Sequence, residues 1–265
     1  MFKNKVGLEA EFFVTNKKEE LVFPADYGFE TDDFVILGEI RAEPATSRAE
    51  TVANFWKVYY EALENAKAND LNISFGHDNE GYSEVKPDFY AKILRLVGVK
   101  TIAKCKNIYD TDLLTLSDAK IKKGKVVSNY LSIGLHVHFS SQNIEKRHWE
   151  YNNTPYELVN VPLKLSGKSV FNLELYKRGI QSTASKDFEV GISRITNPVI
   201  KHFVKEMDEN LLKKYKQCVN LKYRNPGFYE LKHYGFEYRS LPFNEDTYHG
   251  IYEITDFAFS LLEDL

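Results

Sequence analysis

The fold is decided by the stretch Gly134-Leu135-His136-Val137-His138-Phe139-Ser140, which alternates between apolar and polar or small residues. In a β-strand, successive side chains point to opposite faces of the sheet. The alternation therefore predicts a strand whose apolar residues pack into a core, while His136 and His138 project together from the other face. Such a face suits the lining of a polar cavity. A half-exposed strand with incidental histidines is the alternative that this stretch alone leaves open.

Three other segments show the same alternation and add charged side chains to it. Near the N-terminus, Glu9 and Glu11 share one face of an otherwise apolar stretch, residues 7–14. The later segments read Glu39-Ile40-Arg41-Ala42-Glu43-Pro44 and Tyr234-Gly235-Phe236-Glu237-Tyr238-Arg239-Ser240-Leu241-Pro242. Pro44 is expected to end its strand because proline has no N–H for the ladder. For Glu9 and Glu11 a solvated surface strand is the alternative. For Glu39, Arg41 and Glu43 it is a ladder of ion pairs on a solvent face, and for Arg239 it is neutralisation of nearby glutamates.

A shared polar face would carry a large negative charge if these four strands belonged to one sheet. Its five carboxylates would be Glu9, Glu11, Glu39, Glu43 and Glu237, against the guanidinium groups of Arg41 and Arg239. A sheltered cluster of that charge is unfavourable without cations, or it raises the pKa values of several carboxyl groups. Oxygen ligands with one histidine favour Mg²⁺ or Mn²⁺ over Zn²⁺. The two arginines would then bind a substrate carboxylate or a phosphoryl group.

Composition narrows the class of protein. The 265 residues suffice for one large domain or two small ones, and a net charge of −3 gives no basic footprint for nucleic acid. Cys105 and Cys218 lack the spacing of a cysteine-rich metal site, and so few cysteines suit a reducing compartment. The N-terminus shows no secretory apolar region, and no apolar run is long enough to cross a membrane. We therefore expect a soluble, cytoplasmic protein.

Three helices are predicted between and after these strands. Ser47-Arg48-Ala49-Glu50 has the spacing of a capping box and opens a helix that extends to about Asn69. A second helix begins at Asn197-Pro198 and reaches about Gln217. The last follows a cap at Asp246 or Thr247 and carries its apolar stripe from Ile251 to Leu261.

The order of the four polar-faced segments resembles that of the glutamine synthetase and glutamate–cysteine ligase superfamily of carboxylate–amine ligases. The closest resemblance is to its phage-encoded members. They show a Gly-x-Glu-x-Glu first strand, a Glu-Ile-Arg-x-x-Pro-like second strand, a Gly-x-His-x-His strand and a Tyr-Gly-x-Glu-Tyr-Arg strand. The motifs are matched by Gly7–Glu11, Glu39–Pro44, Gly134–His138 and Tyr234–Arg239, so the resemblance covers roughly residues 6–243.

The resemblance implies an α+β fold over one domain, residues 1–265. A curved antiparallel sheet, shaped as a funnel or half-barrel, would line an active-site cavity, with helices on the outer face and ATP and metal ions inside. It implies metal ligands at Glu11, Glu39, His136 and Glu237, and then at Glu9 and Glu43. His138 and Arg239 fall at nucleotide or phosphoryl contacts, and Arg41 suits the substrate carboxylate.

One position departs from the phage pattern. Those members tend to carry an arginine several residues before the Tyr-Gly-x-Glu strand, whereas this chain has Phe228-Tyr229-Glu230-Leu231-Lys232. Lys232, Arg224 or Arg194 are the substitutes for that phosphate contact.

The function expected from these residues is an ATP-dependent ligase. It would activate a carboxylate as an acyl phosphate and join it to an amine with Mg²⁺ or Mn²⁺ as cofactor, in the host cytoplasm if phage-encoded. The substrates would be ATP, an amine, and a small, peptide or protein carboxylate. A guanidine-type phosphotransferase is a second reading, although it needs a reactive cysteine and an array of arginines. A non-catalytic metal- or peptide-binding module is the third.

Overall fold

The four polar-faced strands lie side by side in an eight-stranded sheet. The structure, a computed structural model, describes residues 2–31, 36–85, 105–109, 120–122, 125–151, 163–165, 168–170, 184–215 and 225–265. The main path of the sheet runs β2 (Gly38–Arg41), β1 (Lys3–Thr15), β8 (Leu135–Tyr151), β13 (Gly235–Tyr238), β12 (Phe228–Lys232) and β5 (Cys105–Asn107). Neighbours pair antiparallel throughout, so the fold is mixed α+β with a large antiparallel sheet, as predicted.

Two further strands extend this sheet, and two small sheets stand apart from its main path. β3 (Asn72–Ser74) pairs with the end of β1, and β11 (Ala184–Ser193) pairs with the outer half of β8. The small sheets are β4–β7–β6 (Tyr82–Val85, Lys125–Ser132, Lys120–Lys122) and β10–β9 (Lys168–Val170, Leu163–Leu165). Within the described residues the large sheet is open, because its main path ends at β2 and β5 without the two pairing.

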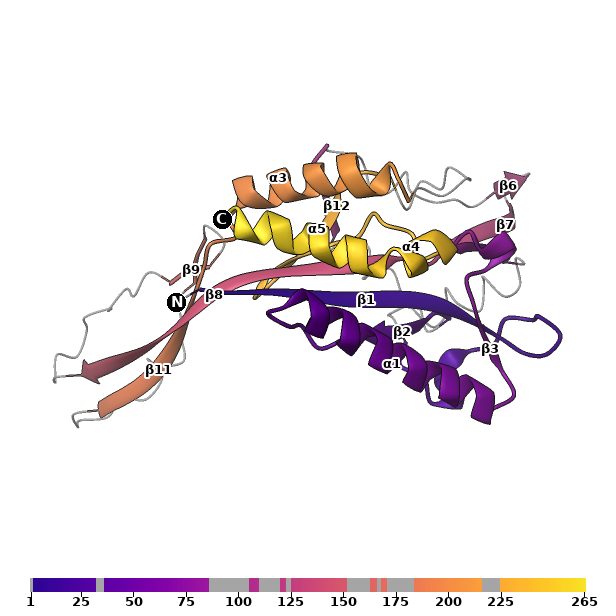
Figure 1. Cartoon of the computed structure of the whole chain (residues 1–265), viewed down its shortest axis with the longest axis horizontal. Helices are drawn as coiled ribbons and strands as arrows, with labels where there is room; N and C mark the ends of the chain where they lie inside the picture. Colours follow the sequence, from indigo (N-terminus) through magenta and orange to yellow (C-terminus); the bar gives the residue numbers. More distant parts are fainter. Residues whose placement is uncertain are drawn as a thin grey trace.

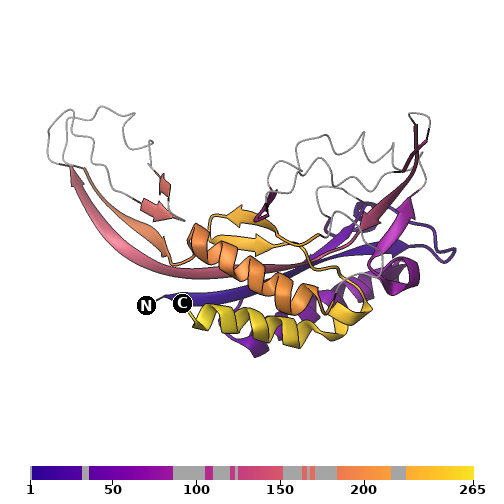
Figure 2. The ribbon, with the colours of Figure 1, turned by 90° about the horizontal axis from the view of Figure 1, so that it is seen from above.

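Helices cover one face of the sheet. Among the described residues they are α1 (Arg48–Ala68), α3 (Asn197–Met207), the π-helical turn η6 (Asp208–Leu212), α4 (Glu245–His249) and α5 (Ile251–Glu263). The short 3₁₀ turns η1 (Pro24–Tyr27) and η2 (His77–Asn79) lie in loops. In Figure 1 α1 runs along β1 and β2, and α5 lies between α1 and α3 in the helical layer. Phe203 of α3 packs directly on Phe139 and Phe236 of the sheet. Figure 2 shows the long helices together on the outer side of the curved path of β8. No helix among the described residues is long and apolar enough to cross a membrane.

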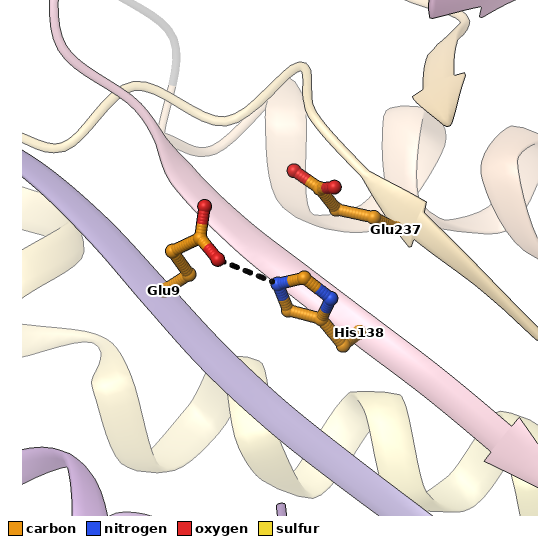
Figure 3. Close-up of side chains that lie close together, drawn as sticks. All are labelled: Glu9, His138 and Glu237. Atoms are coloured by element: carbon orange, nitrogen blue, oxygen red, sulfur yellow. Dashed lines mark ion pairs between the residues drawn. The ribbon is translucent and has the colours of Figure 1, made fainter. Parts of the chain in front are cut away.

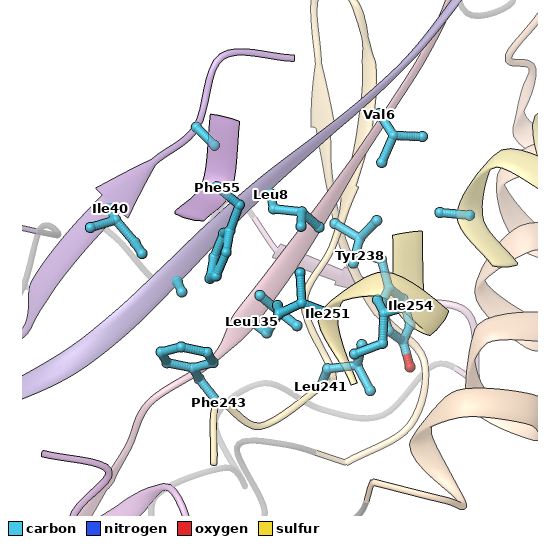
Figure 4. Close-up of a cluster of buried hydrophobic side chains, with 14 of the residues drawn as sticks. Val6, Leu8, Ile40, Phe55, Leu135, Tyr238, Leu241, Phe243, Ile251 and Ile254 are labelled. Carbon is cyan, nitrogen blue, oxygen red and sulfur yellow. The ribbon is translucent and has the colours of Figure 1, made fainter. Parts of the chain in front are cut away.

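The apolar faces of the central strands form the core with these helices. Leu8 and Leu135 are almost fully buried and pack with Ile251 and Ile254 of α5 and with Phe55 of α1 (Figure 4). Phe139 and Phe236 face each other across β8 and β13, with parallel rings whose centroids lie 4.8 Å apart. Burial of such a side chain contributes about 1.5–3 kcal/mol to the stability of the fold. The apolar residues therefore fix which face of each central strand turns toward the helices.

The helix starts test the predicted caps. Ser47 caps α1 by accepting from the backbone N–H of Glu50, and Asn69 follows its end, as predicted. The predicted helix cap at Asp246 or Thr247 is wrong. The Asn244 side-chain oxygen accepts from the N–H of Thr247, and the Thr247 hydroxyl accepts from the N–H of Asn244. Asn244 is therefore the N-cap of α4, and Thr247, the third residue of the helix, completes a reciprocal capping box. The turn at Gly250 then separates α4 from α5.

The second polar-faced strand is shorter than predicted. β2 ends at Arg41, and the chain keeps contact with β1 through the Ala42 N–H, which donates to Leu8 O at 3.0 Å, and through paired bonds between Val6 and Ala45. Pro44 lacks an N–H and lies between these contacts, so it interrupts the regular ladder before Ala45. Glu43 consequently lies outside the strand and is exposed.

A buried acid joins the helical layer to the sheet. Asp208 begins η6 and is 5% exposed, and the Tyr238 hydroxyl of β13 donates to its Oδ1 at 2.7 Å. Burial raises the pKa of Asp208 to about 6, and hydrogen bonds from Tyr238, the Gly227 backbone and Tyr109 offset that effect only in part. Because the folded pKa is raised, this group stabilises the protein at low pH, and the contribution is lost as pH rises through about 6.

We expect Asp208→Asn to remove this pH dependence, since the amide oxygen can still accept from Tyr238. Between pH 4 and 7 the free energy of unfolding of the variant should rise relative to the unmodified protein by up to about 3 kcal/mol. Urea titrations of both proteins across this range measure the difference. If the free energies of unfolding of the two proteins stay parallel across this pH range, Asp208 titrates in the folded protein as it does in the unfolded chain.

Candidate functional site

The register of the strands brings the polar residues into neighbouring positions. Glu9 in β1 lies opposite Arg41 of β2 on one side and opposite His136 of β8 on the other. His138 of β8 lies opposite Glu237 of β13. These side chains project from the face away from the core, so the expectation that four polar faces adjoin is confirmed.

His136 lies at the centre of the cluster and is fully buried. Its Nδ1 lies 3.0 Å from Glu237 Oε1 and 3.3 Å from Glu9 Oε1, and its Nε2 lies 3.7 Å from Glu11 Oε1. Burial and the charge of Arg239 lower the pKa of His136, but the carboxylates of Glu11 and Glu237 outweigh them and raise it above its ordinary value. The imidazole is thus held in a strongly negative environment.

Glu9 contacts both histidines. Its Oε2 lies 3.4 Å from His138 Nε2, an ion-pair geometry drawn in Figure 3, and its other oxygen faces His136. Burial alone would raise the pKa of Glu9, but hydrogen bonds and charge from His136 and His138 leave that pKa well below its usual range. Glu9 is therefore ionised and shared between the two imidazoles.

Glu237 is fully buried and has two cationic neighbours. Arg239 Nη1 lies 2.6 Å from its Oε1, and Lys232 Nζ lies 2.7 Å from its Oε2. Burial would raise the pKa of Glu237, but His136, Arg239 and His138 hold it well below its ordinary value. A charged carboxylate is stable here only because these partners surround it.

Glu230 is a member of the cluster that was not predicted. It lies opposite Glu237 in the β12–β13 pair, 3.1 Å from Lys232 Nζ and 3.4 Å from Arg239 Nη1. Lys232, predicted as a phosphate contact, comes from the same strand. The sequence carried a signal for both, since Glu230 and Lys232 alternate with the apolar Tyr229 and Leu231.

The remaining members of the cluster lie on β1 and β2. Arg41 forms an ion pair with Glu39 through Nη2, and its Nε lies 3.6 Å from Glu9 Oε2. The buried Glu11 accepts the N–H of Gly134 at 2.7 Å through Oε2, which fixes the start of β8 against β1. The Arg41 side chain is 52% exposed, so it can meet an incoming anion at this side of the cluster.

Two predicted residues lie elsewhere, and a third is not among the described residues. Glu43 is exposed beyond the end of β2. Arg194 follows β11, where its backbone N–H donates to Ser141 O and its guanidinium lies 5.2 Å from the Phe2 ring centroid. Arg224 lies outside the described residues.

Two groups of side chains in the cluster could hold a metal ion. They are Glu9, His138 and Glu237, and Glu9, Glu39 and His136, each with one ligand atom per residue lying within 4.8 Å of the others. Glu9 belongs to both groups. The five carboxylates of the cluster are Glu9, Glu11, Glu39, Glu230 and Glu237, leaving aside the exposed Glu30. With both imidazoles counted as neutral, they exceed the three cations, Arg41, Lys232 and Arg239, by two charges. A divalent cation would offset that excess.

Comparison of the chain with models of protein families, with curated proteins and with solved structures found no match.

We expect Glu9→Gln to weaken Mn²⁺ binding by more than tenfold, because this change removes a charged oxygen ligand from both groups. Glu43→Gln is the matched control, since Glu43 is the same residue type but exposed and outside the cluster. Titration calorimetry of the unmodified protein and both variants measures the affinities. Equal affinities for all three proteins would place any metal site elsewhere.

Proposed function

We propose that this chain is an ATP-dependent carboxylate–amine ligase that activates a carboxylate as an acyl phosphate and joins it to an amine. One observation carries the proposal: the register sets Glu-x-Glu, His-x-His and Glu-x-Arg side by side on one face, with their side chains in contact. The motifs are the ones that resemble the phage-encoded ligases of the glutamine synthetase superfamily. Their order along the chain supported that resemblance, and their adjacency now adds a shared site.

The donor set fits divalent cations and an anionic substrate. Glutamate oxygens dominate both metal-capable groups, with one imidazole in each, which suits Mg²⁺ or Mn²⁺. Cations bound there would neutralise charge on the β- and γ-phosphates of ATP. The excess of two negative charges among the side chains favours binding of the cation together with the nucleotide.

The cationic side chains have distinct tasks in this proposal. Arg239 and Lys232 lie beside Glu237 and are partly exposed, so they can bind the phosphoryl group as its charge develops. His138, next to Glu9, would contact the same group. Arg41 reaches farthest into solvent and would bind the carboxylate that is to be activated, because its planar fork matches two carboxylate oxygens.

The wider setting belongs to the same proposal. The curved sheet would form the wall of a funnel or half-barrel, with nucleotide and metal inside and the helices outside, in a single domain. The partners would be ATP, an amine and a small, peptide or protein carboxylate. The place of action would be the cytoplasm, that of the host if the chain is phage-encoded.

The nucleotide product tests the chemistry. We expect ATP, incubated with the protein, Mg²⁺ or Mn²⁺, amino acids and cell extract, to yield ADP and phosphate with a mass-shifted amide product. Acyl-phosphate formation breaks the bond to the γ-phosphate, so AMP and pyrophosphate should not accumulate. Chromatography of the spent nucleotide decides this, with the Glu237→Gln protein as the inactive control.

AMP as the main product would refute the mechanism. ADP release without any amide would favour a phosphotransferase, and no release of ADP would favour a binding module.

Arg239→Lys tests the role of the guanidinium fork. Lysine keeps the positive charge beside Glu237 but loses the two parallel donors, so turnover should fall by about tenfold or more, about 1.4 kcal/mol in the barrier. Melting temperature and ATP affinity should barely change, because the lost interaction strengthens mainly in the transition state. Near-normal turnover in the lysine protein, or its failure to fold, would assign Arg239 to charge neutralisation alone.

A further inference from the structure

Tyr234 touches the cluster but has no task in the proposed reaction. It occupies the turn between β12 and β13, and its hydroxyl oxygen lies 2.6 Å from His138 Nδ1. The other ring nitrogen of His138, Nε2, lies 3.4 Å from Glu9 Oε2. One imidazole therefore joins a phenol on one side to an ionised carboxylate on the other.

The chemistry of the partners decides where the single proton of a neutral imidazole lies in this arrangement. An ionised carboxylate only accepts, so when the His138 ring is neutral its proton lies on Nε2, toward Glu9. Nδ1 then has a lone pair, and the Tyr234 hydroxyl must donate to it. Burial, and then the charges of Glu237, Glu9 and Glu230, raise the pKa of Tyr234 above its ordinary value, so the hydroxyl keeps its proton.

A bound cation reverses this requirement. Glu9, His138 and Glu237 come from three neighbouring strands and point to the same side of the sheet (Figure 3), with ligand atoms within 4.8 Å of one another. Because Nδ1 of His138 contacts Tyr234, the nitrogen that can ligate is Nε2, which faces Glu9. A ligating nitrogen needs its lone pair. The ring proton must then lie on Nδ1, where its partner has to accept.

We propose that Tyr234 is the positioning residue of this group and that its hydroxyl lets His138 exchange tautomers when a divalent cation binds. The inference rests on the cation site of the proposed function, and it makes His138 Nε2 a ligand of that cation in place of the phosphoryl contact given to His138 above. One proton leaves Nε2 for solvent while one proton from solvent arrives at Nδ1, so the imidazole stays neutral. The Tyr234 hydroxyl rotates from donor to acceptor, so the contact that measures 2.6 Å in this structure would be kept when the cation binds.

A hydroxyl is suited to this task because it both donates and accepts. A carboxylate at the same place would hold the proton on Nδ1 permanently, and an ammonium group would hold it on Nε2. The partner on the second nitrogen of a metal-bound histidine fixes the tautomer and the orientation of the ring. Tyr234 can fix the tautomer and the ring orientation of His138 both with and without a cation bound to Glu9, His138 and Glu237.

Nitrogen-15 NMR of the histidine side chains in the full chain tests the tautomer directly. Zn²⁺ serves as the probe because it is diamagnetic and binds imidazole, and His138→Gln assigns the signals of His138. We expect the Nε2–H tautomer without metal and the Nδ1–H tautomer with Zn²⁺. The same tautomer in both states would overturn the proposal, and this result does not depend on whether Tyr234→Phe folds.

Tyr234→Phe tests the hydroxyl, with Tyr60→Phe as the control, since Tyr60 is an exposed tyrosine on α1. We expect Tyr234→Phe to weaken Mn²⁺ binding 10- to 100-fold in calorimetry, the usual cost of losing the partner of a metal-bound histidine. Its metal-free His138 signals should lose their single-tautomer pattern, and Tyr60→Phe should match the unmodified protein. Unchanged affinity and unchanged signals in Tyr234→Phe would overturn the proposal. Neither measurement uses ATP, so a failure here is distinct from a failure of the ligase chemistry.

Discussion

The pairing register of β1, β8 and β13 is the constraint on which the rest of the structure depends. Opposite pairs such as Glu9 with His136 and Glu237 with His138 exist only in this register. A slip by one residue would turn every side chain of a strand to the other face. It would bury glutamates among the helices and expose Leu8 and Leu135, so the apolar face and the charged face enforce the same alignment.

The charged face is stable because its buried groups have partners. His136 and Glu237 are both fully buried, and an isolated charge in either position would carry a large desolvation cost. Arg239 and Lys232 offset part of the negative charge, and Glu9 lies between the two imidazoles. The remaining excess of carboxylates is what makes the cluster suited to cations and to phosphate-bearing substrates. Structure and proposed function therefore depend on the same set of contacts.

Period-two alternation predicted much of this fold and site. It gave the four central strands, their buried faces, and the shared side of Glu9, Glu11, His136 and His138. Glu230 was missed although it lies opposite Glu237 in the short β12–β13 hairpin and its alternation with Tyr229 and Leu231 was a readable signal. The contact between Tyr234 and His138 was missed for a different reason. It depends on where the β12–β13 turn sits over β8, and pairing between strands far apart in sequence is not encoded in any one segment. Glu43 continued an alternation that Pro44 interrupts, and the backbone there leaves the ladder.

Anomalous diffraction from crystals grown with Mn²⁺ and a non-hydrolysable ATP analogue tests the central claim most directly. The account predicts manganese peaks within coordination distance of the Glu9 carboxylate, on the face shared by β1, β8 and β13, with the terminal phosphates beside Arg239. Manganese bound only at other places, or a nucleotide bound away from this face, would contradict it.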